Sequence, residues 1–362
     1  MTESDIILET VSLRREFVTD SPLFGAPTLV HAVDGVNLQI RRGETFAIVG
    51  ESGCGKSTLA RLLVRLIDPS AGSVIYKGQD ISRTGSADLR ALRRDLQFIF
   101  QDPFSSLNPQ MTVGALVEEP LKTHKLGTSK ERKAKVAEML VRVGLSPQHA
   151  DRYPHEFSGG QRQRIGIARA LVSEPTVLVG DEPVSALDVS IQAQVVNILQ
   201  DLKDAFGLTL IIIAHDLAVI RHMADRVAVM YLGEIVEIAE ADALFDAPKH
   251  PYTEALAAAI PLPQVGARKL QSRLDGDPPN PINPPSGCRF HPRCAYAIPR
   301  CTEDRPILQP VGDGREAACH RATELNLNGL ADTKIKRSAA SQLRFDLYRQ
   351  ARTGQDTTTT NV

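Results

Sequence analysis

Glycines, a lysine and a serine between residues 50 and 57 have the spacing of a phosphate-binding loop. The sequence is Gly50-x-x-x-x-Gly55-Lys56-Ser57, the P-loop pattern. Glycines let the backbone curl with its amides pointing inward, and a helix start adds partial positive charge. Lys56 has the reach for the β- and γ-phosphates, and the Ser57 hydroxyl suits Mg²⁺. The pattern predicts a nucleoside triphosphate site lined by Gly50, Ser52, Gly53, Cys54, Gly55, Lys56, Ser57 and Thr58.

Two carboxylates form a second group that could do chemistry on a phosphate. Asp181 and Glu182 follow the apolar run 176–180. Paired acids at the end of a buried strand repel each other unless a cation compensates them. We expect Asp181 to bind Mg²⁺ and Glu182 to polarise the water that attacks the γ-phosphate. The alternative is a simple turn at the end of the strand.

Four further side chains are candidates for the same site. His215 follows the apolar strand-like run 210–214, and Gln101 follows the run 97–100. Ligands of open α/β sheets bind at the C-terminal ends of strands, so we expect His215 to contact the γ-phosphate and orient the water. A structural histidine is the alternative. Phe17 or Phe24 could stack on an adenine ring, although a lone aromatic more often belongs to a core.

The surrounding pattern supplies the elements that position these residues. The apolar run 45–49 is typical of a buried strand, and four leucines from Leu59 to Leu66 have helical spacing. This strand–loop–helix context favours a P-loop over a glycine-rich turn with a chance lysine. Residues 6–17 and 32–40 alternate in the manner of strands.

A mostly helical insertion is predicted over residues 104–170, between strands of the core. It contains an expected helix over 128–143 whose basic cluster 130–135 suits a solvated face. Ser158-Gly159-Gly160-Gln161 opens the next helix with Ser158 as its N-cap, and two glycines at a helix start favour an anion. Residues 185–188 open another helix that extends to about residue 206.

The order of these motifs resembles that of ATP-binding-cassette (ABC) ATPases over about residues 5–245. The resemblance implies an α/β P-loop NTPase with a RecA-like core, an antiparallel β-subdomain and a helical subdomain. It implies ATP and Mg²⁺ as cofactors, Lys56, Glu182 and His215 as catalytic residues, and Ser57, Gln101 and Asp181 around Mg²⁺. Gly180 replaces a more usual residue before Asp181, and we expect this to be tolerated.

The same resemblance implies that two cassettes act together. Ser158, Gly159, Gly160 and Gln161 are similar to the signature that clamps the nucleotide bound by the opposite subunit, and Asp188 to a loop that communicates across the dimer. Gln101 is similar to the glutamine that senses Mg²⁺ and the transmembrane partner.

A narrower resemblance involves residues 100–109, 250–253 and 284–288. These are similar to ATPases of oligopeptide/dipeptide importers, specifically the F-type partner of the pair. This implies import of di- or oligopeptides, with nickel or another small solute as the alternative. It also implies a paralogous second ATPase subunit, two transmembrane permeases, an extracytoplasmic solute-binding protein, and a place on the cytoplasmic side of the cell membrane. The predicted extension covers residues 246–325.

Four of the five cysteines lie in this Cys- and Pro-rich extension. In a reducing compartment such a group favours metal over disulfides. The spacing does not match the paired C-x-x-C knuckles of a zinc ribbon. Four thiolates suit a [4Fe–4S] cluster or a Cys₄ zinc site, and the absence of any metal is the third possibility. The resemblance to family members that carry a cluster at these cysteines makes the cluster our preferred interpretation; the residues are Cys288, Cys294, Cys301 and Cys319.

Composition and charge limit the classes of partner that we expect for this chain. The formal net charge is −1, so the protein has no global basic field that would attract nucleic acid, and we expect no nucleic-acid partner. An ABC ATPase that acts on nucleic acid or ribosomes is the less favoured alternative. No apolar run approaches the length of a membrane span, and residues 1–9 lack the basic start of a secretory signal. Residues 326–362 are polar and predicted to be a largely disordered tail.

Overall fold

The structure is a computed structural model of the 362-residue chain. It describes residues 5–20, 28–102, 106–185, 187–214, 217–259, 276–277 and 279–330. The predicted tail after residue 330, Phe24 and His215 lie outside the described residues.

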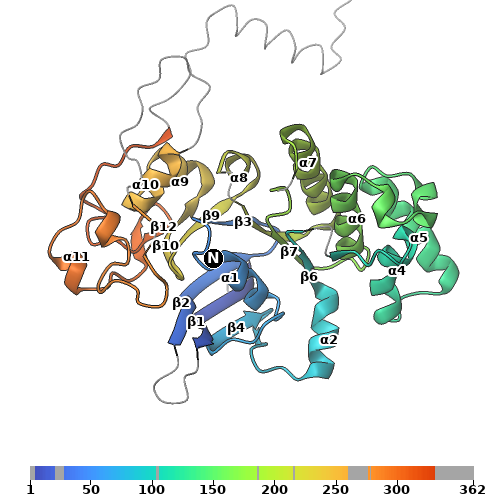
Figure 1. Cartoon of the computed structure of the whole chain (residues 1–362), viewed down its shortest axis with the longest axis horizontal. Helices are drawn as coiled ribbons and strands as arrows, with labels where there is room; N and C mark the ends of the chain where they lie inside the picture. Colours follow the sequence, from blue (N-terminus) through green and yellow to red (C-terminus); the bar gives the residue numbers. More distant parts are fainter. Residues whose placement is uncertain are drawn as a thin grey trace, which may run out of the picture.

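An eight-stranded mixed sheet forms the centre of the molecule (Figure 1). Its order is β11-β12-β10-β9-β3-β8-β7-β6, and the strands from β9 to β6 pair in parallel. β3, β7 and β8 are buried along their whole length, as expected for parallel strands covered on both faces. The strands are β3 (Thr45–Val49), β6 (Leu96–Ile99), β7 (Val177–Asp181), β8 (Thr209–Ile213), β9 (Arg226–Tyr231), β10 (Glu234–Glu240), β11 (Gln309–Gly312) and β12 (Arg315–Ala317).

A second, antiparallel sheet has the order β2-β1-β4-β5. It packs on the central sheet and on the P-loop helix through one apolar cluster that includes Leu13, Phe46 and Leu62. This sheet is the expected antiparallel β-subdomain. Its strands are β1 (Ile6–Asp20), β2 (Thr28–Arg41), β4 (Ala71–Tyr76) and β5 (Gln79–Asp80).

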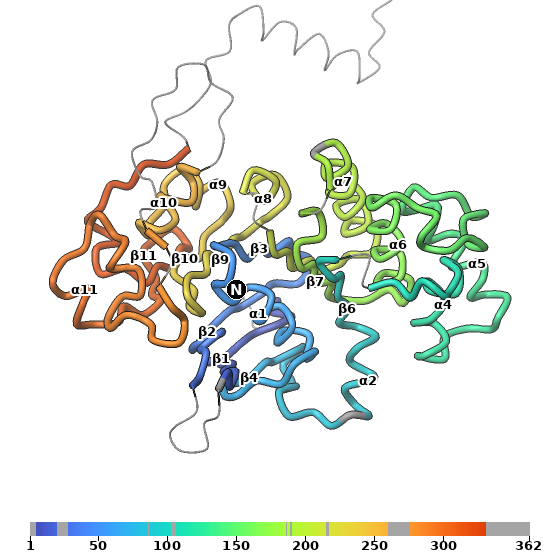
Figure 2. Tube along the Cα trace, viewed as in Figure 1, coloured from blue at the N-terminus to red at the C-terminus, as the bar shows by residue number. Residues whose placement is uncertain are grey.

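Helices cover the sheet and build the insertion between β6 and β7. Within the insertion α4, α5 and α6 pack together at one end of the molecule (Figure 2). The helices are α1 (Lys56–Leu63), α2 (Ser86–Asp95), α4 (Val113–Thr123), α5 (Ser129–Arg142), α6 (Gly159–Leu171), α7 (Val189–Phe206), α8 (Leu217–Met223), α9 (Ala241–Asp246), α10 (Pro251–Ala258) and α11 (Arg300–Glu303). Among the described residues, no helix combines the length and apolar character needed to cross a membrane.

The C-terminal extension lies at the end of the molecule opposite the helical insertion (Figure 1). Its strand β12 pairs with β10, and β11 pairs with β12, so the extension lengthens the central sheet. The domain boundary at residue 245 stays a prediction. The strand pairing shows that the two parts share hydrogen bonds across it.

Candidate nucleotide-binding site

The P-loop connects the end of β3 to the start of α1, and two of its glycines are required by close backbone approaches. Gly50 has φ +153°, and a β-carbon there would lie 2.2 Å from the Met230 carbonyl oxygen. Gly55 has φ +107°, and a β-carbon would lie 2.0 Å from the Ala32 oxygen. Any other residue would clash with backbone at either position, so the glycines let the loop lie tightly between β9 and β2.

Lys56 is buried and points back into the loop. Its ammonium group donates to the carbonyl oxygens of Gly50 and Glu51, both at 2.8 Å, and lies 3.8 Å from the Cys54 sulfur. A buried ammonium needs such acceptors. Its position in the loop suits the oxygen atoms of a bound phosphate.

Ser57 and Asp181 meet across the site and fit Mg²⁺. The Ser57 hydroxyl donates to Asp181 Oδ1 at 2.8 Å. The other carboxylate oxygen, Oδ2, is buried without a hydrogen-bond partner among the described residues, and Arg61 lies 3.9 Å from it. Burial raises the pKa of Asp181, while Ser57 and Arg61 partly oppose that shift. A buried, unsatisfied carboxylate oxygen beside a hydroxyl is a donor set that a hard cation satisfies.

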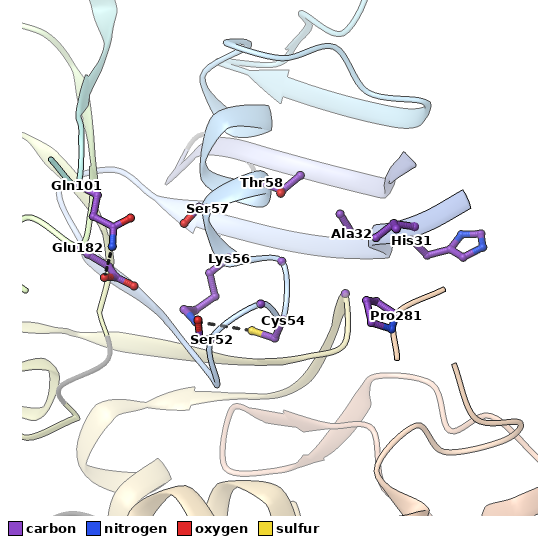
Figure 3. A pocket seen from close by; sticks show the side chains of 14 residues that line it. His31, Ala32, Ser52, Cys54, Lys56, Ser57, Thr58, Gln101, Glu182 and Pro281 are labelled. Atoms are coloured by element: carbon purple, nitrogen blue, oxygen red, sulfur yellow. Dashed lines mark hydrogen bonds between the residues drawn. The ribbon is translucent and has the colours of Figure 1, made fainter. Parts of the chain in front are cut away.

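Glu182 and Gln101 form the opposite wall (Figure 3). The Gln101 side-chain amide donates to Glu182 Oε2 at 2.8 Å. Glu182 is buried and adopts φ +49°, a left-handed conformation that is rare outside glycine. Just before this pair, a β-carbon at Gly180 would lie 3.1 Å from both Ile212 and Pro183, so the absence of a side chain suits the packing there.

One cavity of about 240 Å³ brings together Lys56, Ser57, Gln101 and Glu182, whereas Gly50 and Asp181 are not part of its lining. Its lining includes residues 52–58, Gln101 and Glu182. Sequence reasoning missed part of the wall, because its residues lie outside the motifs and most of them are small or apolar. The missed residues are Val30, His31 and Ala32 of β2, Gly233 after β9, and Pro281 of the extension. Figure 3 labels His31, Ala32 and Pro281.

Phe17 does not line this cavity. It lies on β1 opposite Val30 of β2, and the Arg15 guanidinium lies 4.6 Å from the centre of its ring. The ring is partly exposed. Adenine stacking by Phe17 stays a prediction.

The signature residues lie apart from the cavity lining. Ser158 is the N-cap of α6, and its hydroxyl accepts the Gln161 N–H at 3.4 Å while Gln161 Oε1 accepts the Ser158 N–H at 3.1 Å. A β-carbon on Gly160 would lie 2.6 Å from Ile191, whereas Gly159 has open space. Asp188 is the exposed N-cap residue of α7. These groups therefore do not complete the cavity of their own chain.

The four extension cysteines line a single small cavity of about 20 Å³. All are free thiols. Burial raises the pKa of Cys288 to about 12 and of Cys319 to about 11, and it also raises the pKa of Cys294. Across the described part of the chain, no three His, Cys, Asp or Glu side chains come together in a group able to hold a metal. The thiols fit a metal by type, but their arrangement does not form a metal site.

Family models match two parts of the chain. One, described as "ABC transporter", matches residues 33–185, and another, "Oligopeptide/dipeptide transporter, C-terminal region", matches residues 236–301. The structure is also similar to the ATP-binding cassette MJ0796, solved as a dimer in a post-hydrolysis state with ADP and Pi. That match has a TM-score of 0.59 at 29% identity and covers 65% of this chain and 99% of that one.

Curated relatives align along nearly their full length. A probable peptide ABC transporter ATP-binding protein of Sinorhizobium fredii is 51% identical, covering 88% of this chain and 90% of the relative. The oligopeptide transport ATP-binding protein OppF of Escherichia coli is 50% identical, covering 84% and 93%. Together with the P-loop cavity, these matches confirm the predicted ABC fold and ATP hydrolysis with Mg²⁺. The chain belongs to the family of ABC transporter ATP-binding proteins that carry the oligopeptide/dipeptide transporter C-terminal region.

Proposed function

We propose that this chain is the ATP-hydrolysing subunit of an importer for di- and oligopeptides. The observation that carries the proposal is the match of residues 236–301 to the oligopeptide/dipeptide C-terminal region. Relatives named for peptide, oligopeptide and dipeptide transport support it at 47–52% identity. Import of nickel or another small solute by the same ATPase is the alternative.

The proposed mechanism is a clamp made of two cassettes. Lys56 and the P-loop amides would hold the phosphates, and Ser57, Asp181 and Gln101 would hold Mg²⁺, which would neutralise phosphate charge. Glu182 polarises the attacking water and His215 orients it. Residues 158–161 and Asp188 act on the nucleotide that the partner cassette binds. Their absence from the cavity lining of this chain supports that assignment. ATP binding closes the pair, and loss of phosphate reopens it.

The clamp requires partners that convert closure into transport. We infer a paralogous second ATPase subunit, two transmembrane permeases and an extracytoplasmic solute-binding protein, with this chain on the cytoplasmic side of the cell membrane. The dimeric state of MJ0796 supports the two-cassette arrangement.

Reconstitution tests the solute. The chain is placed in proteoliposomes with its permeases, second cassette and binding protein, and ATP-dependent uptake of radiolabelled dipeptide, pentapeptide and ⁶³Ni²⁺ is compared. Peptide uptake that disappears without ATP supports the proposal. Uptake of nickel alone selects the alternative, and stimulation of ATP hydrolysis only by nucleic acid or ribosomes overturns the transport assignment.

A metal at the four cysteines is a separate proposal. It is supported by the convergence of Cys288, Cys294, Cys301 and Cys319 on one cavity, and it requires the thiols to rearrange around the ion. We propose a [4Fe–4S] cluster, with zinc as the alternative. Anaerobically purified protein should be brown and contain about four iron atoms and four acid-labile sulfides per chain. Colourless protein with one zinc selects the alternative, and metal-free protein overturns both.

A further inference from the structure

The C-terminal extension holds one P-loop residue by two independent contacts. The carboxylate of Glu51, which follows Gly50, accepts hydrogen bonds of 2.7 and 3.0 Å from the Arg293 guanidinium. Arg293 ends the 3₁₀ turn His291–Arg293, 242 residues away in sequence. Tyr252 of α10 holds the backbone, because its hydroxyl accepts the Glu51 N–H at 2.8 Å. The extension therefore fixes both the side chain and the backbone of a residue in the phosphate-binding loop.

Glu51 places a negative charge in a loop that must hold a triphosphate. Residues 52–58 line the nucleotide cavity, whereas Glu51 lines an adjoining cavity with Tyr231 and residues 279–281. An unpaired carboxylate this near would repel the phosphates. The Arg293 fork neutralises the charge and fixes the carboxylate at both oxygens. The Arg293 side chain is only 5% exposed, so solvent and salt screen the pair weakly.

Arg293 is itself held in place by the packing around it. Its guanidinium lies 3.5 Å from the Tyr231 hydroxyl. Tyr231 and Tyr252 pack at 4.7 Å between ring centroids, and each lies 5.3 Å from Phe290, the residue that precedes the 3₁₀ turn. An aromatic cluster thus joins β9, α10 and the turn, and the guanidinium does not depend on Glu51 alone for its position.

We propose that Arg293 is a positioning residue of the nucleotide site: by pairing with Glu51 it removes a repulsion that would otherwise weaken ATP binding. Through this pair the extension raises the affinity of the P-loop for ATP. The inference rests on the ATP site of this family and is independent of the transported solute.

A double-mutant cycle tests the proposal on the full chain. Binding of the fluorescent analogue mant-ATP with Mg²⁺ is measured for the wild type, Arg293→Ala, Glu51→Gln and the double variant. We expect Arg293→Ala to weaken binding about tenfold, and Glu51→Gln alone to change it less than about twofold. The double variant should regain the affinity of Glu51→Gln, since the repelling charge is gone. Arg300→Ala, which breaks an exposed ion pair with Asp304 in the same extension, is the matched control and should bind normally.

Two results would overturn the proposal. One is wild-type affinity in Arg293→Ala. The other is a double variant that binds as weakly as Arg293→Ala, which would assign Arg293 to the folding of the extension alone. If Arg293→Ala does not fold, Arg293→Lys replaces it in the same cycle with a smaller expected loss, because lysine cannot pair with both oxygens. Failure of the wild type to bind mant-ATP would instead refute the nucleotide site.

Discussion

At the scale of single residues, Glu182 combines a strained backbone with a fixed side chain. Its φ of +49° costs about 1–3 kcal/mol. The Ile213 carbonyl accepts its N–H at 3.0 Å, and the Ser185 hydroxyl donates to its carbonyl oxygen at 3.1 Å. These bonds hold the conformation that directs the carboxylate at Gln101, and strain of this kind is concentrated at functional sites.

Replacement of Glu182 separates binding from turnover. Glu182→Gln keeps the shape of the side chain but removes the carboxylate that polarises water. We expect ATP binding to persist while phosphate release falls about 10²–10⁴-fold. Mant-ATP titration and a phosphate-release assay check the two quantities, with Glu240→Gln at an exposed position as control. Undiminished hydrolysis would remove Glu182 from the catalytic role.

Replacement of Lys56 should have a different effect from replacement of Glu182, because Lys56 contributes to the binding of ATP. Lys56→Ala removes the ammonium group that is buried against the loop carbonyls, so the charge available to the phosphates is lost. We expect both ATP binding and hydrolysis to be lost, measured by the same two assays. Lys122→Ala, which removes an exposed side chain whose partner Glu118 also pairs with Arg132, is the control. Unchanged ATP affinity in Lys56→Ala would contradict the phosphate assignment.

At the scale of elements, two insertion helices begin in the same way. α5 and α6 both start with a capping box, formed by Thr128 with Glu131 and by Ser158 with Gln161. Each box satisfies amides that the first helical turn leaves unpaired. Only the α6 box belongs to the sequence proposed to contact the partner's nucleotide.

The two caps therefore form a matched pair for mutation. Thr128→Ala and Ser158→Ala should each lower the free energy of unfolding by about 1 kcal/mol. Urea denaturation measures this. In the assembled transporter, Thr128→Ala should keep normal ATP turnover, whereas Ser158→Ala should lose at least about tenfold because it also removes a nucleotide contact. Equal turnover in the two variants would limit Ser158 to a capping role.

Glu237 of β10 predicts a pH-dependent stability. Its buried carboxylate accepts the N–H groups of Lys249 and His250, and burial raises its pKa to about 7. Between about pH 4.5 and 7 the folded chain therefore holds a proton that the unfolded chain releases, so this contribution to stability is lost as pH rises through that range.

The measurement compares wild type with Glu237→Gln by urea denaturation from pH 5 to pH 8. The stability advantage of the wild type should be largest near pH 5 and shrink toward pH 8. Exposed Glu240→Gln, at the end of the same strand, should show no such trend. A difference that grows with pH would contradict the expected sign.

At the scale of the whole molecule, the helical insertion and the cysteine-bearing extension lie at opposite ends of the central sheet (Figure 1). The nucleotide cavity lies between them. The cavity collects the P-loop, Gln101, Glu182 and Pro281, while residues 158–161 lie outside its lining. In the proposed clamp, the signature of a second cassette would complete this site.

Turnover should consequently depend on a second cassette. The isolated chain should hydrolyse ATP slowly, and addition of its partner ATPase should raise the rate per site, because the partner's signature completes the cavity. A phosphate-release assay over a range of partner concentrations checks this, with a partner altered at its signature serine as control. Full activity in the isolated chain at concentrations where it is monomeric would refute the clamp.

The motifs of the cassette could be predicted from the sequence without the fold. The P-loop, the strand ending in Asp181 and Glu182, and the α6 cap at Ser158 are local patterns, and their elements form where periodicity and capping predict them. The P-loop motif predicted glycine at positions 50 and 55, but the close approach of the Met230 and Ala32 carbonyl oxygens to them is a tertiary contact that the sequence does not show.

The contacts between the extension and this site are visible only in the folded structure. Pro281 reaches the nucleotide cavity and Arg293 pairs with Glu51 because the chain folds back onto β9 and β10. Nothing in the sequence around Arg293 indicates that it pairs with a residue 242 positions earlier. Contacts between distant segments follow from the packing of the aromatic cluster and the strand pairing, which no local pattern encodes.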